Sequence, residues 1–276
     1  MRRVSSLVPF LSRAYSLAVR SRLMDLAWFR RIYAGAYFAY KRRLEDPFDG
    51  LVRRRPDLFR SGHILDVGAH IGYTSSIFFR VLGPGFRVYA FEPDPANVRM
   101  LRETVHRKGA DGIIVPVQAA VGAEDGEVEL WRNPLHPGDH RLATPWFRQW
   151  GGARIAETLR VSLVSLDGFL GREDPTTPVA FVKIDVQGYE PAVCQGMAKL
   201  LERCPRAVVA LEYGPRELSA QGFDPPRLTE FFRSRGYLAH LLEKDGSFST
   251  LPDDLDHLAE KGRGYLDLLM LPGGRT

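Results

Sequence analysis

Short apolar runs alternate with segments of helical periodicity along most of the chain. The run that begins at Ile64 follows polar Ser61 and Gly62, turns at Asp66 and two glycines, and continues into apolar positions at helical spacing. A short buried run of this kind is typical of a parallel strand. The first unit is therefore predicted to be a strand, a glycine loop and a helix.

The alternation continues toward the C-terminus. Further strands are predicted at 86–91, 113–121, 127–131, 160–164, 179–185, 207–211, 237–242 and 265–271. One predicted helix begins after Asp94, with Pro95 at its first position, and stops at Gly109; another covers Pro226 to Arg235. Strands that alternate with helices predict an α/β fold with a mostly parallel sheet.

The glycine loop is suited to an adenosine ligand. Gly68 and Gly72 allow a ligand to approach the backbone, and the N-terminus of the following helix presents unpaired amides. A dinucleotide site needs G-x-G-x-x-G, whereas these glycines stand as G-x-x-x-G behind Asp66. Glu92 ends the second strand about twenty residues past the loop, where a carboxylate accepts hydrogen bonds from ribose hydroxyls. The pattern favours adenosine without a pyrophosphate.

Three motifs follow one another in a fixed order: DVGAHIG at 66–72, FEPDP at 91–95 and KIDVQGYE at 183–190. Together they resemble the FkbM family of S-adenosylmethionine-dependent methyltransferases. The resemblance implies a Rossmann-like class I methyltransferase fold, with a seven-stranded sheet, helices on both faces and an antiparallel last strand. It also implies S-adenosylmethionine as the cofactor. The predicted cofactor-binding residues are Asp66, Gly68, His70, Gly72, Glu92 and Gln118.

The predicted catalytic groups lie at the ends of strands. Ligands of open α/β sheets bind outside the carboxyl ends of the strands, so Asp66, Glu92, Gln118, Asp185 and Glu212 should line one crevice. Its carboxylates suit a cationic sulfonium. Methyl transfer to an alcohol needs alignment and a group that takes the hydroxyl proton, and by resemblance Asp185 faces the transferring methyl. A purely structural contact of Asp185 with a helix amide or a water stays open.

A long insertion separates the strands predicted at 127–131 and 160–164. Its Trp146, Phe147 and Trp150 argue against disorder, so we interpret it as a substrate lid, with a packed excursion over the sheet as the alternative. The insertion also contains the cluster HPGDH at 136–140. Surface histidines are a commoner explanation of such a cluster than a metal site, so no metal is predicted, and His140 is a candidate substrate contact or base.

Charge divides the chain into two parts. Residues 1–44 hold ten Lys or Arg and one acid, a net charge of +9, which leaves −4 for the rest. An enzyme that acts on nucleic acid should be basic around its active site, so no nucleic-acid partner is predicted. No stretch reaches the roughly 18 uncharged apolar residues of a membrane-spanning helix. The predicted partner is a small molecule with a hydroxyl group.

The division suggests two units: a basic helical N-terminal extension, 1–60, and a methyltransferase domain, 61–276. Apolar clusters between arginines predict amphipathic helices in 1–44, and 47–62 is predicted to be a connector. Arg13 interrupts the apolar run and argues against a secretory signal, whereas an organelle transit peptide stays open. We favour a helical cap on the domain, with contact to a membrane surface as an addition.

Two cysteines, Cys194 and Cys204, are too few for a disulfide framework and suggest packing roles in a reducing compartment. A cytoplasmic location, with membrane association as an option, is therefore predicted. The favoured function is an S-adenosylmethionine-dependent O-methyltransferase that acts on a sugar, glycan or polyketide-type alcohol. The alternative is an inactive cofactor-binding domain that docks on a membrane or partner through its basic arm. An NAD-dependent dehydrogenase is disfavoured by the glycine spacing.

Overall fold

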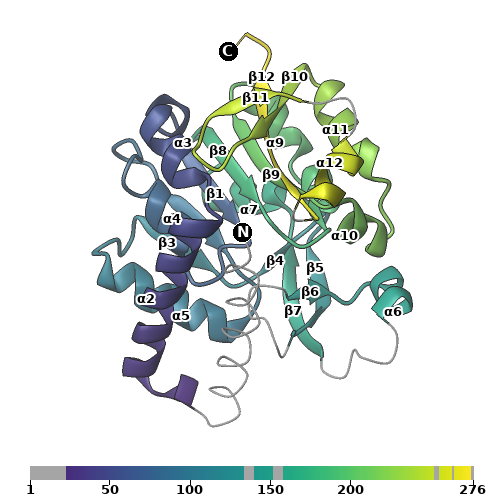
Figure 1. Cartoon of the computed structure of the whole chain (residues 1–276). Coiled ribbons are helices and arrows are strands. Elements are labelled where there is room, and N and C mark those ends of the chain that lie inside the picture. Colours follow the sequence, from purple (N-terminus) through teal and green to yellow (C-terminus); the bar gives the residue numbers. More distant parts are fainter. Residues whose placement is uncertain (1–22, 134–139, 152–157, 252–254, 263, 275–276) are drawn as a thin grey trace.

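The structure is a computed structural model that describes residues 23–133, 140–151, 158–251, 255–262 and 264–274. Its centre is an eight-stranded sheet in the order β11-β10-β12-β9-β8-β1-β2-β3 (Figure 1). The strands are β1 (His63–Val67), β2 (Val88–Phe91), β3 (Ile114–Val117), β8 (Val179–Ile184), β9 (Val208–Tyr213), β10 (Tyr237–Leu242), β11 (Phe248–Thr250) and β12 (Leu266–Pro272). Five neighbouring strands, β9, β8, β1, β2 and β3, are parallel to one another. The strand β12 is antiparallel to both of its neighbours, β9 and β10.

The sheet has one strand more than the sequence predicts. After β10 the chain turns at Asp245 and Gly246 and returns as β11, which pairs antiparallel with β10 and becomes the edge. The strand predicted at 113–121 is also divided, because the amide of Ala119 bonds back to the carbonyl of Val117 at 3.0 Å. The residues after this turn form β4 (Ala120–Val121), which joins a different sheet.

That second sheet has four strands in the order β4-β7-β5-β6. The strands β5 (Gly126–Trp131) and β7 (Thr158–Val164) are the two predicted to flank the insertion, and β6 (Arg141–Leu142) and α6 (Pro145–Gly151) belong to the insertion itself. Phe147 is buried, whereas Trp146 is 61% exposed. The described part of the insertion is therefore packed at its base, while His136 and Asp139 of the HPGDH cluster lie outside the described residues.

Helices cover both faces of the large sheet (Figure 1). They are α2 (Ala27–Leu44), α3 (Phe48–Arg54), α4 (Tyr73–Phe78), α5 (Pro95–Arg107), α7 (Leu166–Glu173), α8 (Glu190–Gln195), α9 (Ala198–Arg203), α10 (Pro215–Ala220), α11 (Pro225–Arg233) and α12 (Leu255–Lys261), with short 3-10 turns at 23–25 and 56–59. The cap of α5 forms as predicted, because the Asp94 side chain accepts the amides of Ala96 and Asn97 ahead of buried Val98 and Leu101.

Alternation along the strands divides the core between the two faces. On β1, Leu65 and Val67 face a cluster that includes α7, α8, α9 and α11, whereas Ile64 faces a cluster that includes α3, α4 and α5. Cys194 and Cys204 are buried and form no disulfide, as expected for packing roles. Among the described residues no helix has both the length and the apolar character to cross a bilayer.

The segment 47–62 was predicted to be a connector, but it folds into regular structure. It forms α3 and a 3-10 turn, and Leu51, Leu58 and Phe59 have no exposed surface. The Phe59 ring lies 4.4 Å, centroid to centroid, from the ring of Phe181 on β8. These residues share the core of the methyltransferase sheet, so a domain boundary at residue 60 stays a prediction that this packing does not favour.

Candidate functional site

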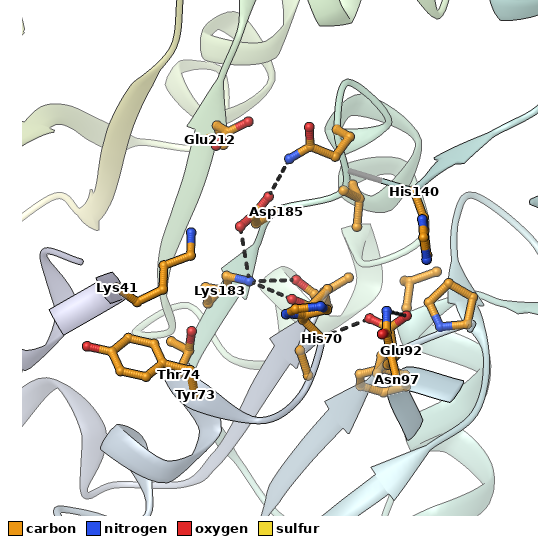
Figure 2. A pocket seen from close by; sticks show the side chains of 18 of the residues that line it. Lys41, His70, Tyr73, Thr74, Glu92, Asn97, His140, Lys183, Asp185 and Glu212 are labelled. Carbon is orange, nitrogen blue, oxygen red and sulfur yellow. Dashed lines mark hydrogen bonds and ion pairs between the residues drawn. The ribbon is translucent and has the colours of Figure 1, made fainter. Parts of the chain in front are cut away.

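A cavity of about 330 Å³ opens at the carboxyl ends of the parallel strands (Figure 2). Its wall includes the glycine loop after β1, Glu92 after β2, Asp185 after β8 and Glu212 on β9. This is the edge at which ligands bind in open α/β sheets. Three of the five strand-end side chains predicted to share one crevice, Glu92, Asp185 and Glu212, therefore line one cavity. Gly68, His70 and His140 also line it.

The glycine loop is held in a conformation that favours glycine. Gly68 has φ +77°, and a Cβ at this position would lie 1.9 Å from the backbone oxygen of Asp185. The amides of Gly68 and Ala69 both bond to the carbonyl of Phe91, at 3.0 and 2.9 Å. The loop therefore passes between the ends of β2 and β8 with no space for a side chain at residue 68.

Glu92 is fixed by three donors at the end of β2. One oxygen accepts the amide of His70 at 3.0 Å, and the other accepts the amide of Asp94 at 3.0 Å and the side-chain amide of Asn97 at 3.2 Å. Glu92 is 5% exposed, and this burial raises its pKa to about 7. A carboxylate oxygen has more than one lone pair, so Glu92 can still accept hydroxyl groups from a ligand in the cavity.

His70 contributes a neutral ring to the cavity wall. Its backbone has φ +50°, and neither ring nitrogen has a hydrogen-bond partner among the described residues. The ring meets the ring of Tyr37 edge to face at 4.9 Å. Burial lowers the pKa of His70 to about 3, so the imidazole is uncharged at neutral pH and can offer one donor and one acceptor to a ligand.

Three of the predicted cofactor contacts do not reach the cavity wall. Asp66 is fully buried beneath it, with one carboxylate oxygen 2.5 Å from the hydroxyl of Ser75. Gly72 faces the core instead, because a Cβ there would lie 2.6 Å from Leu101. Gln118 is exposed, since the chain turns after β3, and the next residue, Ala119, lines the cavity in its place.

Asp185 lies in the cavity as predicted, beside a buried ammonium group. Its side chain is 33% exposed, and one oxygen lies 3.5 Å from Nζ of Lys183. The other accepts the side-chain amide of Gln187 at 3.1 Å. Burial would raise the pKa of Asp185, but the charges of Lys183 and Lys41 outweigh it and hold the pKa below its usual value. The carboxylate is therefore ionised at neutral pH.

His140 is poorly placed to act as a base. Its Nδ1 accepts the backbone amide of Asn133 at 3.1 Å, so the neutral ring carries its proton on Nε2. Nε2 lies 3.7 Å from a carboxylate oxygen of Asp94, the residue that caps α5. This geometry anchors the insertion to α5 and leaves the neutral ring without an accepting nitrogen for a substrate proton.

The cavity also has walls that the sequence did not predict. Tyr37 and Lys41 reach it from α2, and Glu45 reaches it from the cap that follows this helix. Asp267 reaches it from β12, and Tyr265 from the residue before that strand. Nζ of Lys41 lies 2.8 Å from a carboxylate oxygen of Glu45. The extension was predicted to cap the domain, but only tertiary packing shows that these three of its residues contact the site.

Asp185 is one of several carboxylates here, and their pKa values are shifted in opposite directions. Burial and the charges of Asp185, Glu190 and Asp267 raise the pKa of Glu212 well above its usual value. No three His, Cys, Asp or Glu side chains in the described parts of the chain are grouped as a metal site. Asp185 is thus an ionised carboxylate beside lysines, whereas the pKa of Glu212 is shifted in the opposite direction.

Comparison with known proteins gives the family. The model of the methyltransferase FkbM domain matches residues 66–239. The chain is 25% identical over 150 residues to the hexuronic acid methyltransferase AglP of Haloferax volcanii, a match that covers 54% of this chain and 55% of that protein. It is 38% identical over 79 residues to the protein-L-isoaspartate O-methyltransferase of Aeropyrum pernix, a match that covers 29% of this chain and 27% of that protein. The chain spans about half the length of the first relative.

Crystal structures of two methyltransferases are among those to which the chain is similar. The methyltransferase FkbM from Methylobacillus flagellatus KT has a TM-score of 0.49 and 16% identity over 98% of this chain and 59% of that one. The O-methyltransferase TomG from Streptomyces achromogenes has a TM-score of 0.48 and 15% identity, over 95% of this chain and 89% of that one. The family model spans more than half of the sequence and includes all three motifs, so the chain belongs to the FkbM methyltransferase family.

Proposed function

We propose that the chain transfers a methyl group from S-adenosylmethionine to a hydroxyl group of a small molecule, and that this molecule is a sugar or glycan. The observation that carries the proposal is the position of Asp185. It is an ionised carboxylate that faces the cavity from the end of β8, the strand beside β1. Membership of the family makes S-adenosylmethionine the cofactor.

The cavity residues fit this cofactor. Gly68 allows backbone contact, Glu92 and Asn97 can bind ribose hydroxyls, and Ala119 and Leu130 add apolar surface for a base. S-adenosylmethionine supplies an electrophilic methyl group on a sulfonium. The positive charge of that group suits a wall in which Asp185 is ionised.

The proton step falls to Asp185. A hydroxyl that attacks a methyl group loses its proton as the new carbon–oxygen bond forms, and a nearby carboxylate can align the hydroxyl and accept that proton. Asp185 is ionised and partly exposed to the cavity, whereas His140 uses its accepting nitrogen on Asn133. We therefore propose that Asp185 accepts the hydroxyl proton and that His140 positions the insertion.

The rest of the wall favours a sugar over a polyketide-type alcohol. In Figure 2 Lys41 and Glu212 lie on one side of Asp185, and Glu92 and Asn97 lie on the other. Each sugar hydroxyl both donates and accepts a hydrogen bond, so it suits a wall that mixes ammonium and carboxyl groups. The similarity to a hexuronic acid methyltransferase supports the same class.

Calorimetric titration with S-adenosylmethionine, paired with transfer of labelled methyl to methyl hexosides, hexuronic acids and a macrolide alcohol, tests this function. Glu92→Gln should weaken cofactor binding about 10- to 100-fold, as expected for a lost charged hydrogen bond. Because the pKa of Glu92 is about 7, wild-type affinity should also fall below that pH, and the affinity of the variant should not. No binding at millimolar cofactor, or transfer only to the macrolide, would refute the proposal.

Contact with an anionic membrane is a second role, favoured by the outer face of α2. Three of the six exposed large apolar side chains in the described residues are Leu26, Trp28 and Ile32. Trp28 is 57% and Ile32 62% exposed, and exposed Arg31 stands between them. An apolar strip beside arginine is typical of helices that lie on a lipid surface.

Co-sedimentation with vesicles tests this role. The full chain should bind phosphatidylserine-containing vesicles more tightly than neutral ones, and Trp28→Ser with Ile32→Ser should weaken binding about tenfold or more, because two apolar side chains no longer enter the lipid. Leu238→Ser is the matched control, since Leu238 is 50% exposed on a different element, β10. Equal binding by both variants would exclude α2 as the contact surface.

A further inference from the structure

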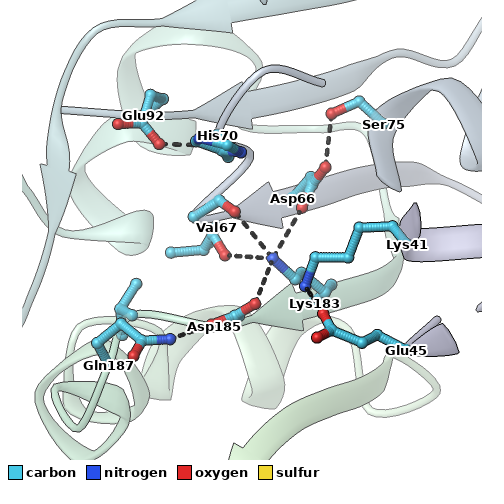
Figure 3. Close-up of polar contacts among 12 residues, drawn as sticks. Lys41, Glu45, Asp66, Val67, His70, Ser75, Glu92, Lys183, Asp185 and Gln187 are labelled. Atoms are coloured by element: carbon cyan, nitrogen blue, oxygen red, sulfur yellow. Dashed lines mark hydrogen bonds and ion pairs between the residues drawn. The ribbon is translucent and has the colours of Figure 1, made fainter. Parts of the chain in front are cut away.

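Lys183 lies at the centre of a buried cluster of polar groups (Figure 3). It is 4% exposed, and its Nζ donates to the backbone oxygens of Gly68 at 2.9 Å and Val67 at 3.3 Å. The same ammonium lies 3.5 Å from a carboxylate oxygen of Asp66 and 3.5 Å from one of Asp185. One side chain thus contacts the buried Asp66 carboxylate, the glycine loop and the proposed proton acceptor.

We propose that Lys183, held from below by Asp66, is a positioning residue that fixes the glycine loop and the Asp185 carboxylate in one geometry. The proposal rests on the proposed function, because Asp185 is the group that it positions. It gives Asp66 a new role: this carboxylate does not touch a cavity ligand but holds the ammonium that does the positioning.

The contacts support this role in two ways. Asp66 is itself fixed, because its second oxygen accepts the hydroxyl of Ser75 on α4. Its first oxygen has no hydrogen-bond partner in the described structure, so the ion pair with Lys183 is the contact that offsets its burial. A lysine ammonium has only three N–H donors, and here two carbonyls of the glycine loop and two carboxylates all contact the same buried ammonium. Displacement of the loop would therefore displace Asp185.

A buried lysine that served stability alone would behave differently. Its removal would lower the unfolding temperature and, because a cation 3.5 Å away is lost, raise the pKa of Asp185, but it would leave turnover of the folded fraction unchanged at a pH where Asp185 is ionised. Removal of a positioning lysine must raise that pKa and also lower turnover at such a pH, because the carboxylate is no longer held in place. Turnover of the folded enzyme on this plateau, together with the titration midpoint of Asp185, separates the two roles.

Other titratable groups also face Asp185 and remain in any Lys183 variant. They are Tyr37 and Lys41 on α2, His70 in the glycine loop, Glu190 on α8 and Glu212 on β9. Lys41 is the cation among them and also lowers the pKa of Asp185. Removal of Lys183 should therefore shift the titration of Asp185 without abolishing its ionisation.

Carbon-13 NMR titration of the aspartate carboxyl groups in the ligand-free protein is the test, with Asp185→Asn used to assign the resonance. In Lys183→Met the midpoint for Asp185 should move upward by about one pH unit or more. The acid limb of the turnover profile should move upward with it, because the proton acceptor must be ionised, and turnover on the plateau above it should fall, because the carboxylate is no longer held in place. Lys199→Met, at an exposed position, is the control and should change none of these.

Lys183→Met alone leaves Asp66 buried without its counter-ion and can fail to fold. The double variant Lys183→Met with Asp66→Asn removes both buried charges and restores neutrality. It should fold, and its Asp185 midpoint should still move upward, by less than in Lys183→Met because the negative charge of Asp66 is removed as well. An unchanged midpoint, or wild-type plateau turnover, in the folded double variant would overturn the proposal, whatever its thermal stability.

Failure of the proposed function would look different. A wild-type protein that binds no S-adenosylmethionine and transfers no methyl group would refute the function, but the titration of Asp185 would still show whether Lys183 controls it. A wild-type enzyme that is active, together with an Asp185 midpoint that is independent of Lys183, would retain the function and refute only the positioning role.

Discussion

Replacement of Asp185 by asparagine should lower turnover by about 10²- to 10⁴-fold, the range for a lost general base. The amide keeps the shape of the carboxylate and its contact with Gln187 but removes the charge that aligns the acceptor and takes its proton. Cofactor affinity should stay close to the wild-type value, because the proposed cofactor contacts come from the glycine loop and Glu92. Single-turnover transfer to a methyl hexoside and calorimetry measure the two effects separately.

Asp224→Asn is a matched control for this change. Asp224 precedes α11, its side chain is 61% exposed, and it makes no side-chain cap contact there. The control should retain full turnover. If Asp185→Asn instead lowered cofactor affinity in parallel with turnover, Asp185 would anchor the cofactor. Near-normal turnover with unchanged affinity would remove Asp185 from the mechanism.

The local pattern predicted much of the site because it depends on strand ends. The motif order placed Gly68, Glu92 and Asp185 after successive buried runs, and parallel strands bring such positions to one edge. The cap at Asp94 was equally local, since a side chain that accepts amides two and three residues later needs no tertiary contact. Such features depend on spacing alone and are therefore present in the sequence.

The same pattern could not predict the direction of side chains that depend on neighbouring elements. Asp66 and Gln118 stand at strand ends in the sequence, yet Asp66 points to Ser75 and Lys183, and Gln118 follows a turn that exposes it. A period of two gives the face of β1 on which Asp66 lies, but it does not give the depth of the cavity, and the turn that exposes Gln118 has no such period. For these reasons neither side chain lines the cavity, although both were predicted to do so.

Residues from distant parts of the chain were missed for a different reason. Lys41 enters the cavity because α2 packs along the domain, where buried Arg30 forms an ion pair with Glu103 on α5. The sequence around Lys41 predicts only a basic, amphipathic helix. The segment 47–62 was predicted to be a connector because it is rich in Arg, Asp and Pro, although Leu51, Leu58 and Phe59 enter the core. Tertiary contacts decide both cases.

Substitution of Gly68 by alanine should be the most destabilising single change in the glycine loop. Two effects act at this position: a positive φ, which costs about 1–2 kcal/mol for a residue with a Cβ, and the overlap of that Cβ with the Asp185 backbone oxygen at 1.9 Å. The overlap can be relieved only if the ends of β1 and β8 separate. We expect the free energy of unfolding to fall by about 4 kcal/mol or more, measured by urea denaturation.

Gly85→Ala isolates the first of these effects. Gly85 has φ +81°, nearly the same as Gly68, but a Cβ there would meet nothing within 4 Å. This control should therefore lose only the roughly 1–2 kcal/mol of the left-handed backbone. The difference between the two variants measures the contact between the glycine loop and Asp185. Equal losses would mean that the two strand ends can separate freely, and then the loop could not hold the carbonyl of Gly68 and the carboxylate of Asp185 at one ammonium group.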